Sequence, residues 1–115
     1  MSIHFYGIPN CDAVKKARKW LEAQGVDYTF HDYKKEGADP AKLRAWIDTV
    51  GLDAVLNRRG TTFRKLSDAD KADIDAAKAV RLMEAQPSLI KRPVVEHAGG
   101  VLVGFQEADW AEAFG

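Results

Sequence analysis

Residues 3–21 read IHFYGIPNCDAVKKARKWL, and the character of the chain changes twice along them. Residues 3–8 are rich in aromatic and β-branched side chains, which predicts a buried strand. Turn-forming residues follow, and from Cys11 to about residue 24 apolar side chains recur with helical spacing. Cys11, the only cysteine of the chain, therefore falls at the predicted amino terminus of a helix.

The position of Cys11 bears on its chemistry. A helix amino terminus favours an anionic neighbour, because its first N–H groups are unpaired and the helix dipole is positive there. A thiolate, the nucleophilic form of cysteine, is expected to be stabilised at such a place. Lys15 lies one turn further on the same helical face and adds positive charge, whereas Asp12 opposes it. A free cysteine is also compatible with a small buried apolar residue, so position alone leaves both interpretations open.

The composition excludes several classes of protein. Lys and Arg number 17 against 17 Asp and Glu in 115 residues, so no overall charge favours nucleic acid, a membrane or an acidic partner. A single cysteine excludes an intramolecular disulfide and a Cys-x-x-Cys redox pair. The three histidines have no metal-ligand spacing, so we expect no metal. With no leader pattern and no stretch of membrane-spanning length, we expect a soluble cytoplasmic protein.

The first half of the chain predicts two strands and two helices. Residues 26–33 alternate between apolar and polar side chains and predict a second strand. Strand, helix and strand form a βαβ unit, so these two strands are expected to be parallel. Asp39, followed by Pro40, predicts the start of a further helix that ends near Gly51.

The second half adds a helical region and a hairpin. The expected elements are a helical region from Ser67 to about Gln86 with a break near Asp73, strands at 94–97 and 101–104 around the turn Ala98-Gly99-Gly100, and a last helix from Gln106 to Phe114. The order β-α-β, helices, then β-β-α favours an α/β protein whose mixed sheet has helices on both faces.

Together with this order of elements, three stretches of sequence resemble the ArsC/Spx/YffB family of arsenate reductase-related proteins, and the YffB branch most. The stretches are Ile8–Asp12 before a Lys-rich helix, Leu56–Leu66, and Ile90–Val95. The resemblance covers essentially the whole chain. It implies a single thioredoxin-like domain over 1–115, with a core at about 1–35 and 88–115 and a helical insertion at about 36–87.

The resemblance also implies a site and a reaction. Cys11 matches the family's nucleophile, and Arg92 matches an anion-binding arginine before a proline, which implies a cis Arg92–Pro93 bond. Lys15 would stabilise the thiolate form of Cys11 by its charge. Asn10 would either donate a hydrogen bond to the thiolate or only form the turn. Members of the YffB branch have been proposed as glutathione-dependent thiol reductases. Since the chain lacks a resolving cysteine, we expect glutathione as the co-substrate, with no bound cofactor and with glutaredoxin as a further partner.

A second candidate region lies in the middle of the chain. A second family arginine falls on Asn57, and Arg58 and Arg59 follow directly. These three residues are expected to bind an anionic substrate or the carboxylates of glutathione. A solvated basic loop is the alternative.

The sequence differs from the family pattern at several positions, and these differences rank the candidate functions. Glutaredoxin-coupled arsenate reductases have a histidine where this chain has Gly7, and they have arginines where it has Asn57 and Gly104. Arsenate needs several charge-assisted donors, so we expect thiol or disulfide reduction first and arsenate reduction second. A third candidate is a non-catalytic regulator that, like Spx, contacts RNA polymerase. Position 14 of this chain, which corresponds to the second cysteine of the Cys-x-x-Cys switch in Spx, is a valine. A disulfide switch within this chain is therefore excluded.

Overall fold

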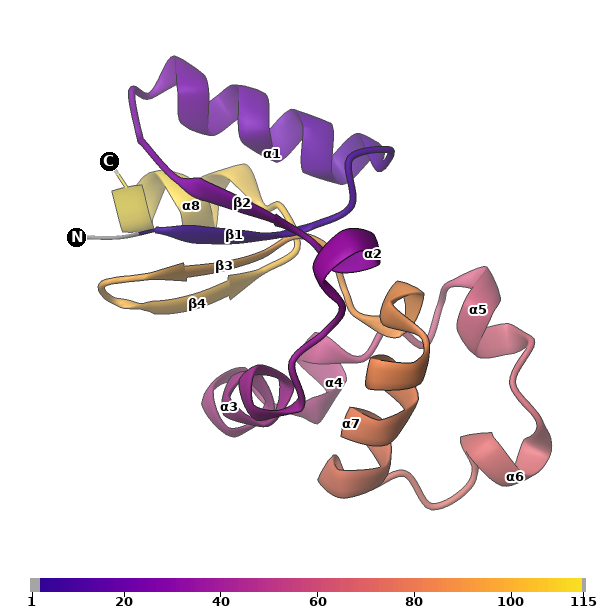
Figure 1. Cartoon of the computed structure of the whole chain (residues 1–115). Helices are drawn as coiled ribbons and strands as arrows, with labels where there is room; N and C mark the ends of the chain where they lie inside the picture. The colour runs from indigo at the N-terminus through magenta and orange to yellow at the C-terminus, as the bar shows by residue number, and fades with distance from the viewer. Residues whose placement is uncertain (1–2, 115) are drawn as a thin grey trace. The chain divides into compact units, whose positions relative to one another are not determined.

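A computed structural model describes residues 3–114. Their contacts divide the chain into two compact units (Figure 1). The sheet unit runs up to Glu36 and resumes at Arg92, and the helical unit is Gly37–Lys91. Within the described part of the chain, no helix is both long and apolar enough to cross a membrane.

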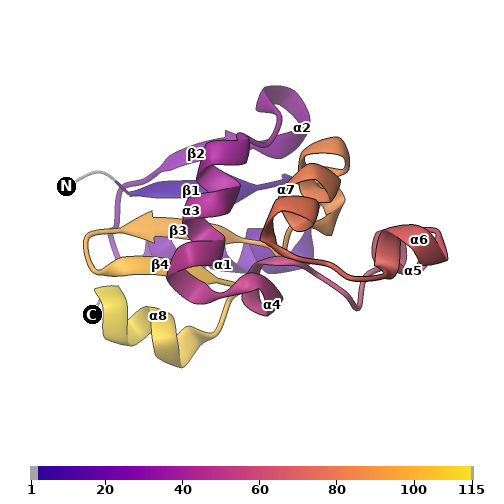
Figure 2. The same ribbon diagram turned by 90° about the horizontal axis from the view of Figure 1, so that it is seen from below.

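Four short strands form the mixed sheet of the sheet unit, in the order β2-β1-β3-β4 (Figure 2). They are β1 (His4–Gly7), β2 (Thr29–Asp32), β3 (Val94–His97) and β4 (Gly100–Val103). β1 pairs with β2 in parallel, with Phe5 opposite Phe30. β1 also pairs with β3 in antiparallel fashion, with Tyr6 opposite Val94, and β3 and β4 form the predicted hairpin. The expected βαβ and ββα order of a thioredoxin-like sheet is confirmed.

Two helices, α1 (Asp12–Ala23) and α8 (Glu107–Phe114), pack their apolar sides into one buried cluster with the sheet. The cluster consists of Phe5, Val14, Ala17, Leu21, Val95 and Trp110. Trp110 lies at its centre, with ring centroids 6.2 Å from Phe5 and 5.0 Å from Phe105. Its indole Nε1 donates to the Gly104 carbonyl over 3.1 Å, so the one polar atom of this buried ring is satisfied.

The second strand is shorter than predicted. It begins at Thr29 instead of residue 26 and ends at Asp32 instead of Tyr33, where a one-turn helix, α2 (Tyr33–Glu36), follows directly. Local side-chain bonds account for the early end. The Asp32 carboxylate accepts from Lys34 N at 2.8 Å, and the Glu36 carboxylate accepts from Asp32 N at 3.2 Å. Such bonds turn the backbone away from the ladder.

The helical unit consists of short helices. They are α3 (Pro40–Val50), α4 (Leu52–Val55), α5 (Thr61–Arg64), α6 (Asp68–Lys71), α7 (Ala76–Ala85) and a 3₁₀ turn, η1 (Pro87–Leu89). The predicted cap of α3 is confirmed, because the Asp39 side chain accepts from Ala41 N at 2.9 Å. Helices α3 and α7 contact each other and contribute Leu43, Trp46 and Met83 to the buried residues.

The predicted break near Asp73 is confirmed, and it separates α6 from α7. Asp73 takes φ of 50°, a left-handed conformation that aspartate tolerates better than most residues. Asp75 then caps α7 by accepting from Lys78 N at 2.8 Å. The Lys78 ammonium donates to the carbonyls of Ala69 and Ala72, which satisfies groups left by the end of α6. Helix α5 was not predicted, since its residues belong to the polar basic stretch.

Replacing Trp110 by alanine is expected to destabilise the protein by about 3–5 kcal/mol, because a fully buried aromatic ring and its hydrogen bond are lost. Urea unfolding followed by circular dichroism measures this loss. Glu112→Ala in the exposed side of α8 is the matched control and should change stability by less than about 0.5 kcal/mol. A comparable loss in both variants would contradict the packing role of Trp110.

Candidate active site at one edge of the sheet

Three segments meet at one edge of the sheet because of strand direction. β1 runs toward the loop that carries Cys11, and β2 runs parallel to it. β3 runs the opposite way, so its first residues lie at the edge where β1 ends. Arg92 and Pro93 directly precede β3, and their peptide bond is cis, as predicted. The sheet therefore brings the Cys11 loop, the Arg92–Pro93 bond and the start of α2 to a common edge.

Cys11 is the N-cap residue of α1. Its backbone is extended, with φ −114° and ψ 128°, and its carbonyl accepts from Lys15 N at 2.9 Å. The side chain makes no capping bond, and Cys11 is a free, half-buried cysteine that packs against the core cluster. The first amide groups of α1 are thus left without a side-chain cap, next to a thiol that can become an anion.

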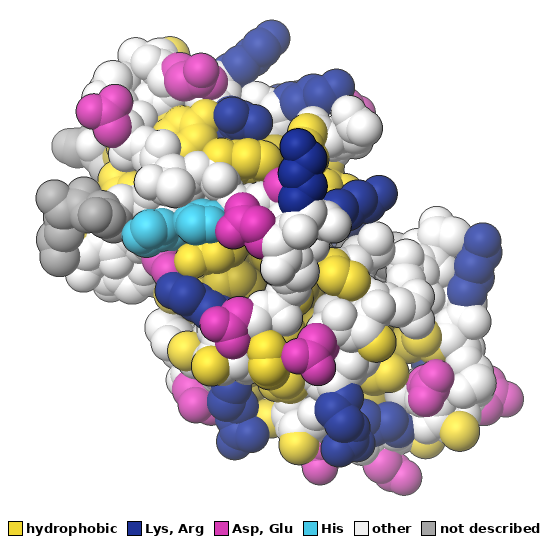
Figure 3. Space-filling view, in the orientation of Figure 1, with side chains coloured by type: hydrophobic (Ala, Val, Ile, Leu, Met, Phe, Trp, Pro, Cys, Tyr) yellow, Lys and Arg dark blue, Asp and Glu magenta, His cyan; other side chains and the backbone are white. Residues whose placement is uncertain are grey.

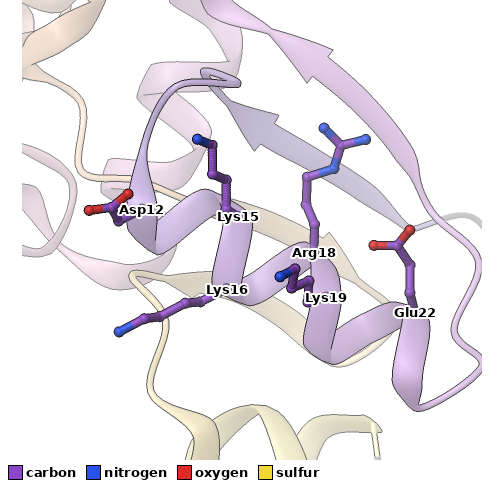
Figure 4. Close-up of a pocket in the computed structure, with 6 residues that line it drawn as sticks. All are labelled: Asp12, Lys15, Lys16, Arg18, Lys19 and Glu22. Atoms are coloured by element: carbon purple, nitrogen blue, oxygen red, sulfur yellow. The ribbon is translucent and has the colours of Figure 1, made fainter.

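The two polar neighbours predicted beside Cys11 are both exposed. Asn10 lies in the loop before the helix, and Lys15 lies on the outer side of α1. Lys15 helps to line a hollow of about 420 Å³ on this helix (Figure 4). The hollow is formed by Asp12, Lys15, Lys16, Arg18, Lys19 and Glu22.

Arg92 is half-buried and Pro93 is buried. The Pro93 carbonyl accepts from Gly104 N at 2.8 Å, which anchors the cis bond to the end of β4. The charge of Arg92 acts on Tyr33, a residue that sequence reasoning did not single out. Burial raises the pKa of the Tyr33 phenol well above its ordinary range, Tyr6 raises it further, and the Arg92 guanidinium opposes them.

Tyr33 is only 3% exposed, and its hydroxyl has no hydrogen-bond partner among residues 3–114. Its ring stacks beside that of Tyr6, with centroids 6.4 Å apart. The sequence held no signal for this burial, because Tyr33 follows a strand and begins a four-residue helix.

Gly7 occupies the position where the resemblance expects a histidine, and packing explains why a side chain is absent. A Cβ atom built at Gly7 would lie 2.9 Å from Cγ2 of Val14. Real Cβ atoms essentially never come so close to another heavy atom. The end of β1 and the first turn of α1 therefore touch only because Gly7 lacks a side chain.

Gly104 occupies the position where the resemblance expects an arginine. Its φ of 74° lies in the left-handed region, which L side chains rarely adopt. Space around it is open, so backbone conformation, not crowding, disfavours arginine there. Of the three arginines expected for an arsenate site, the sheet unit carries one, Arg92.

Asn57, Arg58 and Arg59 belong to the helical unit, where they border a hollow of about 310 Å³ together with Asp53, Leu56 and Lys91. The Asn57 side chain is used locally, since its Oδ1 accepts from Arg59 N at 3.1 Å. Arg58 pairs with Asp53 over 3.1 Å. Both side chains are well exposed, so the pair contributes little stability and leaves the guanidinium available. Arg59 has no ion pair within residues 3–114.

A separate polar cluster lies on the other face of the sheet from Phe5. Ring nitrogens of His4 and His31 are 2.9 Å apart, and His31 Nδ1 lies 3.1 Å from a Glu36 carboxylate oxygen (Figure 3). Tyr6 stacks on His31 at 4.5 Å and donates its hydroxyl to Glu96. The sequence placed the two histidines on neighbouring strands but did not predict this contact. In the described part of the chain, no three His, Cys, Asp or Glu side chains gather as a metal site.

Comparisons with known proteins establish the family. A sequence model described as the ArsC family matches residues 6–113, which is nearly the whole chain. This chain belongs to the ArsC family. A solved structure of a YffB protein is 54% identical, with a TM-score of 0.97 over 99% of this chain and 100% of that one. An arsenate reductase-related protein from Brucella melitensis is also 54% identical, with a TM-score of 0.76 over 99% and 95% of the two chains.

Curated relatives of this ArsC-family chain have different names. A Haemophilus influenzae protein of uncharacterised function is 39% identical over 97% of this chain and 98% of its own length. The global transcriptional regulator Spx of Streptococcus pneumoniae is 29% identical over 86% of this chain and 75% of its own length. Membership of the ArsC family is therefore compatible with both arsenate reductase-related proteins and regulators.

Tyr33→Phe is expected to make the alkaline loss of stability shallower. Above pH 10, the ordinary pKa of tyrosine, the unfolded chain releases the Tyr33 proton while the folded chain keeps it. The unfolded state then binds fewer protons, so the free energy of unfolding falls by up to about 1.4 kcal/mol per pH unit. Urea unfolding between pH 8 and 11 measures this slope. Equal slopes for wild type and Tyr33→Phe would refute the assignment, and Tyr28→Phe, which removes a half-exposed phenol, is the control.

Gly7→Ala is expected to destabilise the protein by about 1–3 kcal/mol through overpacking against Val14. Val14→Ala removes the opposing methyl groups, so the double variant should be less destabilised than the sum of the single variants, by at least about 0.5 kcal/mol. Denaturant unfolding of all four proteins gives this coupling energy. Strict additivity would show that the two residues do not share the space.

Proposed function

We propose that this ArsC-family protein is a glutathione-dependent thiol/disulfide oxidoreductase with Cys11 as its nucleophile. One observation carries the proposal: a free, half-buried cysteine is the N-cap residue of α1 at the sheet edge that also holds the cis Arg92–Pro93 bond. The first amide groups of α1 have no side-chain cap and lie next to this sulfur, where they can donate to a bound anion. An arginine at the same edge supplies a planar pair of donors for a carboxylate or an oxyanion.

The reaction would proceed in two thiol–disulfide exchanges. The Cys11 thiolate attacks the glutathione sulfur of a mixed disulfide, R–S–S–G, and the thiolate of R leaves and takes up a proton. This step forms a disulfide between Cys11 and glutathione. A second glutathione thiolate then attacks the glutathione sulfur of that adduct, forms glutathione disulfide and releases the Cys11 thiolate. The net change is R–S–S–G plus glutathione giving R–SH plus glutathione disulfide.

The remaining site residues would have supporting roles. Arg92 would bind a carboxylate of glutathione, and Lys15 would add positive charge near the thiol. Asn10 and Pro93 would border the bound glutathione. Asn57, Arg58 and Arg59 remain candidates for substrate binding from the helical unit, through the hollow that they line. Glutaredoxin is a further candidate for the second exchange.

Arsenate reduction is the second candidate function. The ArsC fold favours it, and the two glycines at positions 7 and 104 argue against it, because the donors expected there are absent. A regulator that binds RNA polymerase is the third, and the similarity to Spx favours it. Failure to capture purified polymerase at micromolar concentration would remove that candidate.

Wild-type protein incubated with glutathione disulfide should gain one glutathionyl group at Cys11 and lose it again on addition of glutathione. Intact mass spectrometry measures both steps, and Cys11→Ser should show neither. Turnover of the cysteine–glutathione mixed disulfide, coupled to glutathione reductase and NADPH, should be more rapid than arsenate turnover under the same conditions.

Arg92→Lys is expected to lower the rate of adduct formation about tenfold or more, because lysine keeps the charge but loses the paired donors. Arg81→Ala, an exposed arginine of α7, is the matched control and should keep the wild-type rate. An adduct that forms no faster than on free cysteine, or equally fast in Arg92→Lys, would remove the enzymatic proposal.

A further inference from the structure

The outer face of α1 concentrates positive charge next to Cys11. The ammonium groups of Lys15, Lys16 and Lys19 make no hydrogen bond or ion pair within residues 3–114, and they border the hollow of about 420 Å³ on this helix. Figure 4 shows Lys15 and Arg18 extending on one side of the helix, Lys16 on the other side and Lys19 between them. The whole chain has a formal net charge of zero, so this is a local excess.

The charges that border this hollow are four cations and two carboxylates, Asp12 and Glu22. Cations near a helix amino terminus oppose the helix dipole, yet Lys15 and Lys16 lie there, and the last turn of α1, where cations are favourable, has none. Lys15 and Lys19 are spaced i,i+4, and like charges at that spacing repel. Asp12 with Lys16 and Arg18 with Glu22 are opposite charges at the same spacing and offset this repulsion in part. The net charge that remains along the helix is positive.

Arg18 extends the positive surface from α1 to the neighbouring strand. Its guanidinium lies over the ring of Phe30, 4.1 Å from the centroid, and its Nε donates to the Tyr28 hydroxyl over 2.9 Å. This side chain is held in place by stacking and a hydrogen bond. One ordered cation thus stands beside three lysines that can adapt to a partner. We call Lys15, Lys16, Arg18 and Lys19 the cationic face.

We propose that the cationic face binds acidic peptide segments, so that Cys11 acts preferentially on disulfides carried by acidic peptides. The inference rests on the proposed function. Charge complementarity selects the partner, because the net positive charge along α1, which begins one turn from the thiol at Lys15, favours carboxylates near the reacting sulfur. From Cys11 to Lys19 the helix rises about 12 Å, which about four extended residues span. The segment therefore carries two or three acidic residues within about four positions of its cysteine.

The covalent step is the exchange already given, with the acidic peptide as R. Cys11 takes the glutathionyl group from the peptide disulfide, the peptide leaves as a thiol, and glutathione restores Cys11. The cationic face takes no part in bond breaking, and it acts by raising the local concentration of acidic substrates and by slowing their departure.

Two synthetic peptides of equal length test the inference. Each has one cysteine, carried as a glutathione mixed disulfide, and four flanking positions that are glutamate in one peptide and glutamine in the other. Wild type should release the glutamate peptide about tenfold faster at low salt. This advantage should shrink as the ionic strength rises, because screening weakens exposed charge pairs.

Charge reversal at the far end of the cationic face is the decisive variant. Lys16→Glu with Lys19→Glu leaves Cys11, Lys15 and Arg92 intact, and it should bring the ratio of the glutamate-peptide rate to the glutamine-peptide rate close to one. The ratio is the readout because both peptides carry the same anionic glutathionyl group, so any effect of the charge reversal on that group or on the thiol cancels. Lys65→Glu with Arg81→Glu makes the same charge change at exposed positions of the helical unit, and it should keep the preference.

A binding measurement separates this inference from the proposed function. Labelled peptides with serine in place of cysteine cannot react, and their fluorescence anisotropy reports binding alone. Tighter binding of the glutamate peptide, lost in the Lys16/Lys19 variant, would support the cationic face even if wild type cleaved neither disulfide, in which case only the proposed function fails. Three results would overturn the inference. They are equal binding of both peptides, equal losses in the two charge-reversal variants, and tighter binding of a DNA oligonucleotide that depends on Lys16 and Lys19.

Discussion

The antiparallel pairing of β1 with β3 is the constraint on which the sheet unit depends. It joins the start of the chain to its last third, and the Tyr6 hydroxyl reaches Glu96 across 90 positions of sequence. Bringing such distant residues together lowers the entropy of the chain, and only the packing that follows compensates for this loss. Phe5 on β1 and Val95 on β3 lie opposite each other and enter the same buried cluster as Trp110. Burial of these side chains therefore stabilises the pairing that also aligns Cys11 with Arg92.

A consequence of that pairing is that the geometry of the candidate site and the packing of the core are linked. Cys11 itself packs against the core cluster, and Val14, one turn further on, contacts the end of β1 at Gly7. The thiol is held by the same contacts that fix α1 on the sheet, rather than by a flexible loop. Lys15, Lys16 and Lys19 of the same helix are exposed. One helix therefore carries both the contacts that hold Cys11 and the lysines of the cationic face.

Local sequence signals predicted the parts of the fold that depend on few residues. Asp39 before Pro40, the glycines of the hairpin and the apolar spacing of α1 each specify an element without help from distant residues. Helices α2, α4 and α5 were missed because four-residue helices leave no periodicity to read. The cis Arg92–Pro93 bond followed from family resemblance, since proline alone only permits it.

The residues of the candidate site could be predicted from the sequence, but the burial and contacts of the residues around them could not. Cys11, Lys15 and Arg92 stand out by position or resemblance. The burial of Tyr33 and the contact between His4 and His31 depend on strand register and on packing from elsewhere in the chain.

The two glycines at the sheet edge also shape how this protein can evolve. An arsenate site would need a side chain at position 7, which first requires a smaller residue at Val14, and an arginine at position 104, which first requires a different backbone turn. Each change is unfavourable until the other residues have changed. A lineage that starts from this sequence would therefore gain the donors expected for arsenate only through several dependent substitutions.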